Sequence, residues 1–337
     1  MSRPPRIGVI GTGQIARTHV VGYQVAGADI VAVADVNSST LAARQREWGV
    51  ATGYAGYRDL LADPAVDAVS ICTPNSTHYE ITMAAAQAGK HVLCEKPISL
   101  DLAQADEMIE ACSRAGVVFQ VGHHMRSWAA AARSKAMIER GDLGAVAYVR
   151  LRQAHDWGGA RTPRGAFGSR AASGGGTLLD NGCHLFDLAR YLGGDVSDVF
   201  ARIATLKFEV EVEDTAIASL GYASGAMGQI EVAWTGTGWQ EAFWVFGTEG
   251  SLECDNRIGE NVLTHRFRGS SVLSWSETDI ARYELHGLDS HSQNIADFLA
   301  AIDGTGPIVC TGADGREAVR LVQAAYASAD AAAPIRL

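Results

Sequence analysis

The chain has 337 residues, a formal net charge of −10 at pH 7, 47% apolar residues and 20% charged residues. This length exceeds what one small core needs, so we expect two domains. The acidic balance argues against a nucleic-acid partner, and no apolar run approaches the roughly 20 residues that span a bilayer. The six cysteines lack paired spacing, which favours reduced thiols in a cytoplasmic protein over a disulfide framework or a zinc site.

The N-terminal stretch predicts a strand, a glycine turn and a helix. The apolar run Ile7–Ile10 is typical of a strand buried on both faces, and Gly11 and Gly13 follow it at once. A pyrophosphate needs bare backbone N–H groups at a helix N-terminus, and a side chain at Gly13 would hold it off. Ala16 stands where the third glycine of the dinucleotide fingerprint usually stands. The residues predicted to contact a cofactor here are Gly11, Thr12, Gly13, Gln14 and Ile15.

The next predicted strand, Ile30–Ala34, ends at Asp35. An acidic residue there is placed to hydrogen-bond the adenosine ribose hydroxyls, and it would repel a 2′-phosphate. No basic residue stands directly beside it in the sequence, so we favour NAD over NADP. Arg44 and Arg46 lie in the following predicted helix and are expected on its solvated surface. A glycine turn between a strand and a helix can also be purely structural, and Asp35 is what favours the cofactor.

Predicted strands and helices alternate as far as Val121, which predicts an α/β domain with a doubly wound parallel sheet. The later strands of this sheet are expected over Asp67–Cys72, Lys90–Cys94 and Val117–Val121. The intervening helices are expected over Gln14–Ala26, Ser39–Trp48, Tyr57–Leu61, a segment ending at Ala88, and one ending at Ala115. Their expected N-caps include Ser38 or Ser39, Ser76 or Thr77, and Asp101.

From Ala145 onward, longer alternating strands predict an α+β domain with a large, open-faced, mainly antiparallel sheet and helices on one face. A helix over about Asn181–Leu192 interrupts the strands, and helices over Ser290–Ala301 and Ala313–Ala329 close the chain. We place the boundary near Gly122. The expected division is a cofactor-binding domain over residues 1–122 and a substrate-binding and oligomerisation domain over residues 123–337.

Polar residues follow three strands of the predicted parallel sheet, and ligands bind beyond the carboxyl ends of such strands. These residues are Asp35, then Thr73-Pro74-Asn75, then Glu95-Lys96-Pro97. Lys96 precedes a proline, so its backbone is stiff. Near the nicotinamide half of a cofactor it could polarise a developing carbonyl oxygen. The alternative is a surface lysine in a strand-to-helix loop.

A second polar cluster follows the glycine run 174–176. Asp180 and His184 are four residues apart, so on one helix they face the same side. A carboxylate beside an imidazole orients it and raises its basicity, which suits a general base. The alternative is that Asp180 only caps a helix and His184 is a half-buried structural residue. His123 and His124 are adjacent and point in different directions, so no metal site is predicted.

Taken together, these motifs resemble the glucose–fructose oxidoreductase / inositol dehydrogenase / MocA (Gfo/Idh/MocA) family of NAD(P)-dependent oxidoreductases. They occur in the order and spacing of the family and span essentially the whole chain. The matching pieces are Gly11-Thr12-Gly13-Gln14-Ile15-Ala16, Cys72-Thr73-Pro74-Asn75 with His78, Cys94-Glu95-Lys96-Pro97, Gly122-His123-His124 with Arg126, and Gly174-Gly175-Gly176 through Asp180, Gly182 and His184.

The resemblance implies a Rossmann domain and an open-faced sheet domain, with the nicotinamide in the cleft between them. It implies oxidation of a secondary alcohol of a sugar, inositol or related polyol, and a homodimer or homotetramer formed through the open sheets. By the same resemblance, the catalytic residues are Lys96, Asp180 and His184. The inner half of the cofactor would be lined by Thr73, Pro74, Asn75, His78, Glu95 and Lys96.

Residues that contact the substrate are harder to predict. Trp157 could stack on the apolar face of a sugar, beside His155 at the end of a predicted strand. Arg126, Arg161 and Arg164 could bind hydroxyls, or a phosphate or carboxylate if the substrate has one. Trp234 and Trp239 are further candidates, although a tryptophan near a strand end is more often in the core or at a subunit interface.

Two other functions fit the same fold. An NAD-dependent glycosidase would oxidise C3 of a sugar, eliminate the aglycone and reduce the product again, without accumulating NADH. A non-catalytic regulator that senses NAD or a sugar could dispense with the three catalytic residues, so their joint presence argues against it.

Overall fold

The computed structural model describes residues 3–156, 168–257, 262–267 and 279–337. Trp157, Arg161 and Arg164 therefore lie outside the described residues. The chain forms two compact units. Unit 1 comprises Met1–Ser127 and Leu288–Val319, and unit 2 comprises Trp128–Gly287 and Arg320–Leu337. The domain boundary predicted from the sequence assigned all residues after 122 to the second domain, whereas residues 288–319 group with unit 1.

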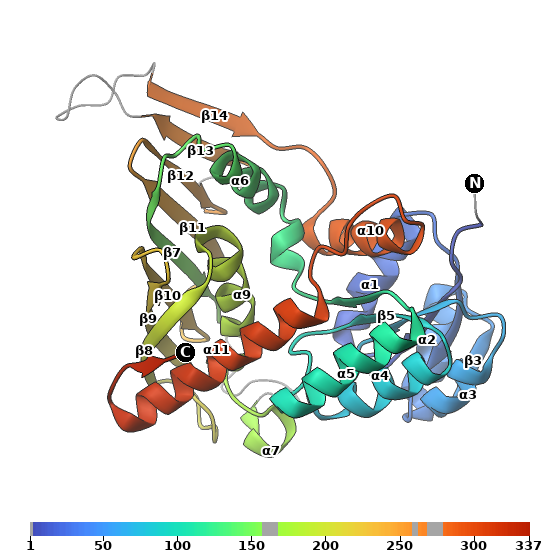
Figure 1. Ribbon diagram of the computed structural model, residues 1–337. Helices are drawn as coiled ribbons and strands as arrows, with labels where there is room; N and C mark the ends of the chain where they lie inside the picture. Colours follow the sequence, from blue (N-terminus) through green and yellow to red (C-terminus); the bar gives the residue numbers. More distant parts are fainter. Residues whose placement is uncertain (1–2, 157–167, 258–261, 268–278) are drawn as a thin grey trace. The chain divides into compact units, whose positions relative to one another are not determined.

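Unit 1 contains a six-stranded parallel sheet in the order β3-β2-β1-β4-β5-β6. Its strands are β1 (Ile7–Ile10), β2 (Ile30–Ala34), β3 (Thr52–Tyr54), β4 (Ala68–Ile71), β5 (His91–Cys94) and β6 (Phe119–Val121). Its helices are α1 (Gln14–Val25), α2 (Ser38–Trp48), α3 (Tyr57–Ala62), α4 (His78–Gln87), α5 (Leu102–Ala115) and α10 (Ser290–Ile302), with 3-10 turns η1 (Asn75–Thr77) and η2 (His124–Ser127). The predicted doubly wound α/β fold is confirmed (Figure 1).

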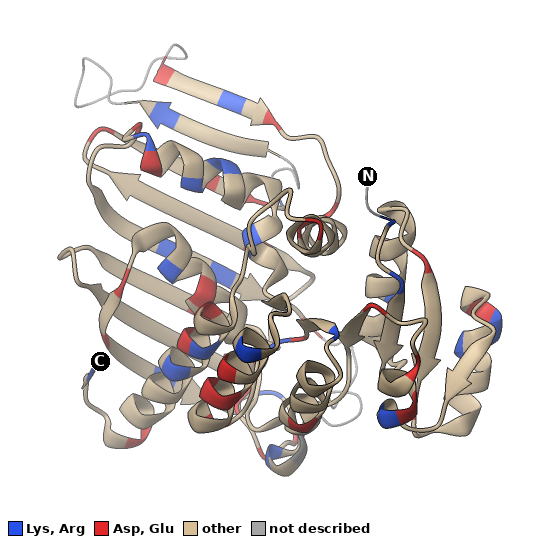
Figure 2. Ribbon diagram, turned by 45° about the vertical axis from the view of Figure 1, so that its right-hand side comes forward, with Lys and Arg blue, Asp and Glu red and all other residues tan. Residues whose placement is uncertain are grey.

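The strands of this sheet are apolar because helices cover both faces. None of the residues in the six strands is Lys, Arg, Asp or Glu, and Figure 2 shows charged residues instead on helices and loops of this unit. One buried cluster includes Ile71, Val92 and Met108, and another includes Val9, Val33 and Phe298. Burial on both faces holds the carboxyl ends of the strands in fixed positions.

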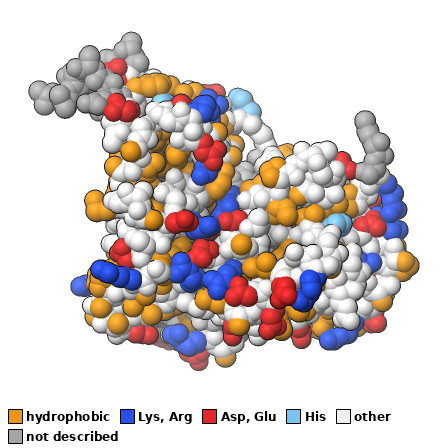
Figure 3. Space-filling model, in the orientation of Figure 1, with side chains coloured by type: hydrophobic (Ala, Val, Ile, Leu, Met, Phe, Trp, Pro, Cys, Tyr) orange, Lys and Arg blue, Asp and Glu red, His pale blue; other side chains and the backbone are white. Residues whose placement is uncertain are grey.

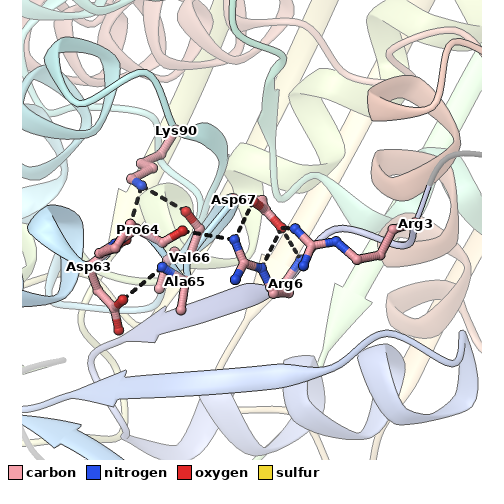
Figure 4. Close-up of polar contacts among 8 residues, drawn as sticks. All are labelled: Arg3, Arg6, Asp63, Pro64, Ala65, Val66, Asp67 and Lys90. Atoms are coloured by element: carbon pink, nitrogen blue, oxygen red, sulfur yellow. Dashed lines mark hydrogen bonds and ion pairs between the residues drawn. The ribbon is translucent and has the colours of Figure 1, made fainter.

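An ion-pair cluster joins the amino ends of two strands, at the edge opposite the predicted ligand site. The carboxylate of Asp67 accepts hydrogen bonds from the backbone N–H and Nε of Arg6, at 2.8 and 3.0 Å, and pairs with Arg3 (Figure 4). Nearby, Lys90 Nζ donates to the main-chain oxygens of Asp63 and Val66. Together these bonds fix how β1, β4 and β5 begin.

Helix termini follow the predictions in part. Asp101 caps α5 by accepting from the N–H of Ala103, as predicted. Helix α2 is capped by Asn37, so the predicted caps Ser38 and Ser39 were wrong by one and two residues. A 3-10 turn precedes α4, and Thr77 bonds Thr73 and Pro74 in place of capping the helix. The short strand β3 was not predicted.

Helix α10 packs on α1 within unit 1. It carries Ile295 and Phe298 into the cluster that also holds Val20 and Tyr23. Its approach is so close that a Cβ at Gly22 would lie 2.5 Å from Ile295 Cδ1. The helix itself was predicted, but its apolar stripe could not reveal which sheet it covers.

Unit 2 is built on a nine-stranded sheet in the order β14-β13-β12-β11-β7-β10-β9-β8-β15. Its strands are β7 (Val146–Ala154), β8 (Val196–Ala204), β9 (Thr215–Tyr222), β10 (Met227–Ala233), β11 (Gln240–Gly247), β12 (Gly250–Asp255), β13 (Val262–Phe267), β14 (Ile280–Glu284) and β15 (Ile335–Arg336). The β7–β10 pair is parallel and the other pairs are antiparallel, so the predicted mainly antiparallel sheet is confirmed. Strands β14 and β15 were not predicted.

Helices cover one face of this sheet (Figure 1). They are α6 (Ala129–Glu139), α8 (Thr177–Asp180), α9 (Gly182–Gly193) and the end of α11 (Gly312–Ala331). The unit also contains the short helix α7 (Arg170–Ser173). On β7, buried Val149 and Leu151 alternate with partly exposed Arg150 and Arg152. The face of the sheet opposite α9 is therefore polar and partly exposed, as an open-faced sheet requires.

Candidate active site

The glycine turn after β1 has the geometry that a phosphate needs. Gly11 has a φ of +81°, and a Cβ there would lie 2.8 Å from the Cys72 carbonyl oxygen, so only glycine fits. A Cβ at Gly13 would meet no protein atom within 4 Å. No side chain caps the N-terminus of α1. The backbone N–H groups at this helix start can therefore receive a pyrophosphate, and the turn fits a dinucleotide.

Asp35, at the end of β2, is bonded to this turn. Its Oδ2 accepts from the backbone N–H and the hydroxyl of Thr12, at 2.8 and 2.7 Å, and its Oδ1 accepts from the N–H of Asn37. An ionised carboxylate has about four acceptor positions, so these three bonds leave capacity for a ribose hydroxyl. The residue joins the glycine turn to the start of α2.

The sequence predicted Arg44 on the solvated surface of its helix, but the side chain is partly buried against the glycine turn. Its Nε donates to the main-chain oxygen of Thr12 at 3.2 Å, and its guanidinium pairs with Glu47. Glu47 also pairs with Arg17 from α1. A basic residue thus approaches the Asp35 region from α2, and it shares the carboxylate of Glu47 with Arg17. The contact between Arg44 and Thr12 could not be predicted by looking only at the residues next to Asp35 in the sequence.

The loops after β4 and β5 are joined by His78. Its Nδ1 lies 2.8 Å from the Pro97 oxygen and its Nε2 lies 3.0 Å from the Thr73 oxygen. The ring is buried, and burial lowers the pKa of His78. A carbonyl oxygen can only accept and a neutral imidazole carries a single N–H, so His78 donates to one of these two oxygens at a time. Its ring is packed between the two predicted cofactor loops.

Lys96 follows the buried Glu95 directly after β5. The backbone N–H of Lys96 donates to Glu95 Oε2 at 3.2 Å, and the Lys96–Pro97 peptide bond is cis. Glu95 Oε1 lies 2.9 Å from Nε2 of His19, a buried histidine on α1. Although burial alone would raise the pKa of Glu95, His19 and the Lys96 charge lower it below its ordinary value. A cationic side chain thus stands at the ligand-binding edge of the sheet, beside a carboxylate.

Asp180 and His184 occupy consecutive helical turns of unit 2. Asp180 ends α8, His184 lies in the first turn of α9, and Asn181 between them keeps helical dihedral angles. The helix predicted over about Asn181–Leu192 is α9, and Asp180 lies in the short preceding helix α8. The four-residue spacing still places both side chains about one turn apart. Asn181 accepts a 3.0 Å hydrogen bond from Trp234 Nε1, which places Trp234 in the core and away from a substrate role.

A buried glutamate, Glu213, holds the start of α8. Its Oε1 accepts from the backbone N–H groups of Gly176 and Leu178, at 3.0 and 2.9 Å, and from the hydroxyl of Tyr326 at 2.8 Å. A Cβ at Gly176 would lie 1.9 Å from the Glu213 main-chain oxygen, and one at Gly175 would lie 2.1 Å from the Tyr326 hydroxyl. Glycine at positions 175 and 176 is thus needed for the close approach of the Tyr326 hydroxyl and the Glu213 main chain.

The predicted substrate contacts have different surroundings. His155 is mostly buried and stacks on Trp239, with ring centroids 4.7 Å apart. Arg126 is buried in unit 1, where its guanidinium pairs with Asp314 at 3.1 Å. His124 stacks on His291, and its Nδ1 lies 3.0 Å from the Ser290 hydroxyl.

Sequence reasoning missed His19 and Glu213. Ala16, His19, Val20 and Tyr23 follow the i, i+3, i+4, i+7 pattern of a buried helical stripe, so His19 is a polar residue on an apolar face. That was a usable signal. Glu213 offered none, because its partners lie 35 or more residues away in the chain.

Within the described ranges, no three His, Cys, Asp or Glu side chains gather in a way that could hold a metal ion. No helix in that same part of the chain is long and apolar enough to cross a bilayer. All six cysteines are buried thiols. On the face seen in Figure 3, acidic and basic side chains are interspersed among apolar ones.

A dinucleotide turn, an acid after β2 and a lysine at the edge of a doubly wound sheet define a nicotinamide-dependent dehydrogenase. Comparison with known families agrees. The oxidoreductase family with an NAD-binding Rossmann fold (GFO_IDH_MocA) matches residues 5–123, and the GFO/IDH/MocA C-terminal domain matches residues 131–253. The chain belongs to the Gfo/Idh/MocA oxidoreductase family, and unit 1 carries its NAD-binding domain.

Several relatives cover nearly the whole chain. The myo-inositol 2-dehydrogenase of Thermotoga maritima is 32% identical over 98% of this chain and 98% of its own length. The 1,5-anhydro-D-fructose reductase of Ensifer adhaerens is 34% identical over 92% of each. Among solved structures, a levoglucosan dehydrogenase in complex with NADH has a TM-score of 0.90 at 26% identity, covering 99% of both chains.

Proposed function

We propose that this enzyme oxidises a secondary hydroxyl of a sugar, an inositol or a related polyol to a ketone. The observation that carries the proposal is Lys96, a cation placed directly after β5 at the edge where this class of sheet binds ligands. The relatives named for myo-inositol and levoglucosan support the substrate class. In this proposal unit 1 binds NAD and unit 2 supplies most substrate contacts.

Three side chains carry the chemistry in this proposal. His184, oriented by Asp180, takes the proton of the substrate hydroxyl. Lys96 donates a hydrogen bond to the same oxygen and stabilises the charge that develops on it as the C=O bond forms. Bound NAD supplies the hydride acceptor. Thr73, Pro74, Asn75 and His78 shape the loops beside the nicotinamide.

The preference for NAD over NADP rests on Asp35. Its carboxylate faces the glycine turn, where it would repel a 2′-phosphate. Arg44 offsets this effect only in part, because it pairs with Glu47, a carboxylate that it shares with Arg17. A clear preference for NADP+ in kinetic assays would contradict this reading of Asp35.

Substrate contacts are proposed from both units. The His155–Trp239 stack presents an aromatic surface, since Trp239 is 52% exposed. Aromatic faces pack well against the apolar face of a sugar ring. Arg126, Trp157 and Arg161 remain proposed contacts.

We also propose a homodimer or homotetramer formed through the open face of the nine-stranded sheet. Ile217, Met227 and Phe246 are 48%, 64% and 41% exposed on that sheet. They lie among matched charges such as Arg150–Glu231. Sedimentation equilibrium should show a dimer or tetramer that Met227→Glu weakens. A monomer at micromolar concentration would contradict the proposal.

The function is tested by an NADH-absorbance screen of inositols, hexoses, anhydrosugars and glycosides with NAD+ and NADP+. NADH accumulation with at least one polyol supports the dehydrogenase. Aglycone release from a glycoside without NADH accumulation would indicate the glycosidase instead. NADH binding without any turnover across the panel would indicate the regulator.

A further inference from the structure

A chain of buried polar side chains crosses unit 1 from α1 to the loop that carries Lys96. We name Tyr23, Ser70, His19 and Glu95 the Tyr23–Glu95 network. The Tyr23 hydroxyl lies 2.8 Å from the Ser70 hydroxyl, which lies 3.0 Å from Nδ1 of His19. Nε2 of His19 lies 2.9 Å from Glu95 Oε1. All four side chains are buried, with exposures between 0% and 7%.

The contribution of this network to stability does not by itself explain why two ionisable side chains are buried here. Burying two ionisable groups costs desolvation energy, and a packed apolar pair of similar size would often be as stable. The network ends at Glu95 Oε2, which accepts the backbone N–H of Lys96. The proposed function uses neither His19 nor Tyr23, so both are polar groups inside an apolar cluster without a role so far.

Glu95 is also held by the chain opposite it. The N–H of Gly122 donates to the Cys94 oxygen at 2.7 Å. A Cβ at Gly122 would lie 2.7 Å from Glu95 Oε1 and 3.3 Å from its Cα. The carboxylate therefore occupies the space that a side chain at residue 122 would need, and its position is fixed from two sides.

We propose that His19 holds the Glu95 carboxylate in place and that Glu95 in turn positions the backbone and the ammonium group of Lys96. His19 and Glu95 are then positioning residues for the proposed reaction. Positioning at this level matters because a displacement of about 1 Å at a reacting group can cost on the order of 100-fold in rate.

The surrounding charges support this arrangement. The ionisable groups around Glu95 come from several elements, and the Cys72 thiol lies beside His19. These groups include His19 from α1, Lys96 from its own loop, His78 from α4, His291 from α10 and the Cys94 thiol at the end of β5. Although burial alone would lower the pKa of His19, Cys72 and Glu95 raise it above its ordinary value. The carboxylate thus stays ionised beside Lys96, where it stabilises the ammonium form.

This inference rests on the proposed catalytic role of Lys96, and the experiment separates the two. Purified Glu95→Gln, His19→Gln and Gly122→Ala enzymes are compared with wild type and with His91→Gln. His91 is a matched control because it lies at the opposite end of β5, where its Nδ1 accepts from the N–H of Val118 at 2.9 Å. Each enzyme is assayed for kcat per NADH-binding site, for the KM of the polyol and for the Kd of NADH.

We expect kcat to fall by about 100-fold in Glu95→Gln and by a smaller factor in His19→Gln, which keeps an N–H donor near Glu95. The NADH Kd and the polyol KM should change far less than kcat in both, although Glu95 lies in a predicted cofactor loop, and His91→Gln should behave as wild type throughout. A purely structural role would lower the folded fraction but leave kcat per NADH-binding site unchanged.

The pH profile supplies a second readout. Without the nearby carboxylate, the ammonium of Lys96 loses a stabilising negative charge, so the alkaline limb of kcat in Glu95→Gln should move to lower pH. If Glu95→Gln does not fold, Gly122→Ala displaces the same carboxylate with its charge intact, and kcat should still fall.

Two outcomes would overturn the inference. One is wild-type kcat and an unchanged pH profile in both His19→Gln and Glu95→Gln. The other is a loss in which the NADH Kd rises in parallel with every fall in kcat. If Lys96→Ala itself retained wild-type turnover, the proposed function would fail instead, so the two failures are distinguishable.

Discussion

Glu95 in unit 1 and Glu213 in unit 2 are both buried carboxylates beside proposed catalytic residues, but they are stabilised differently. Glu95 faces an imidazole and an ammonium group, whereas Glu213 accepts two backbone N–H groups and a tyrosine hydroxyl. The first arrangement places charges around Lys96. The second fixes the backbone that leads to Asp180. The comparison suggests that Glu95 affects the electrostatics of the reaction, while Glu213 affects mainly geometry.

The largest expected effect comes from substituting His184, which lies shortly after the helix that Glu213 holds. In His184→Asn, we expect kcat to fall by on the order of 100- to 10,000-fold, because a general base is lost. NADH binding should be retained. Steady-state kinetics and NADH fluorescence titration measure the two quantities. The matched control is His265→Asn, a buried histidine on β13 of the same unit, which should keep wild-type kcat. Equal losses in the two variants would argue against a specific role for His184.

Glu213 itself should matter less for rate and more for stability. Glu213→Ala removes the acceptor for Gly176, Leu178 and Tyr326, so we expect a loss of about 1–3 kcal/mol in the free energy of unfolding. Glu213→Gln keeps an acceptor oxygen and should lose less. Urea denaturation measures both. Glu209→Ala, which alters an exposed glutamate four residues earlier, should be neutral. If Glu209→Ala were as destabilising as Glu213→Ala, the proposed role of Glu213 would be wrong.

The charge partners of Glu95 predict a pH-dependent stability. The pKa of Glu95 is lowered from 4.5, so its contribution is present above that pH and is lost as pH falls through the folded value. The pKa of His19 is raised from 6.5, so its contribution is present below that pH and is lost as pH rises through the folded value.

The stability difference between wild type and His19→Gln should therefore be largest between pH 4.5 and 6.5 and should shrink as pH rises. Urea denaturation at several pH values from 5 to 10 provides the measurement. A difference that is constant from pH 5 to pH 10 would show that the charge of His19 contributes nothing.

The smallest effect is expected at a partly exposed carboxylate, which contrasts with the two buried ones. The Arg6 hydrogen bond lowers the pKa of Asp67 from 3.8 to about 2. Its contribution is present above pH 3.8 and is lost as pH falls through about 2. Asp67→Asn should be only slightly less stable than wild type at pH 7, since solvent screens this pair. The difference should vanish in acid, and a difference that grew on acidification would contradict the assignment.

The sequence predicted the parts of this molecule that local patterns encode. The run Ile7–Ile10, the glycine turn and Asp35 sufficed for the cofactor domain, because strand, turn and helix are each specified by neighbouring residues. Contacts between distant segments could not be predicted in this way. The approach of Arg44 to Thr12 and of Glu213 to Gly176 depends on tertiary packing.

The candidate site shows the same limit. Motifs predicted Lys96, Asp180 and His184 as catalytic residues, but they did not predict the side chains that surround Lys96 or hold the start of α8. His19 could have been noticed as a polar residue on the apolar stripe of α1. The association of α10 with unit 1 could not be predicted, because the apolar residues Ile295 and Phe298 would suit any sheet face equally well.

The central claim is that Lys96 stabilises the oxygen of a polyol as a hydride leaves its carbon. The most direct measurement is single-turnover NADH formation by wild type and Lys96→Ala, with the best polyol from the screen and saturating NAD+. We predict that the rate falls by on the order of 100- to 1,000-fold in Lys96→Ala, while the NADH Kd stays near wild type. A wild-type rate in Lys96→Ala would contradict the claim.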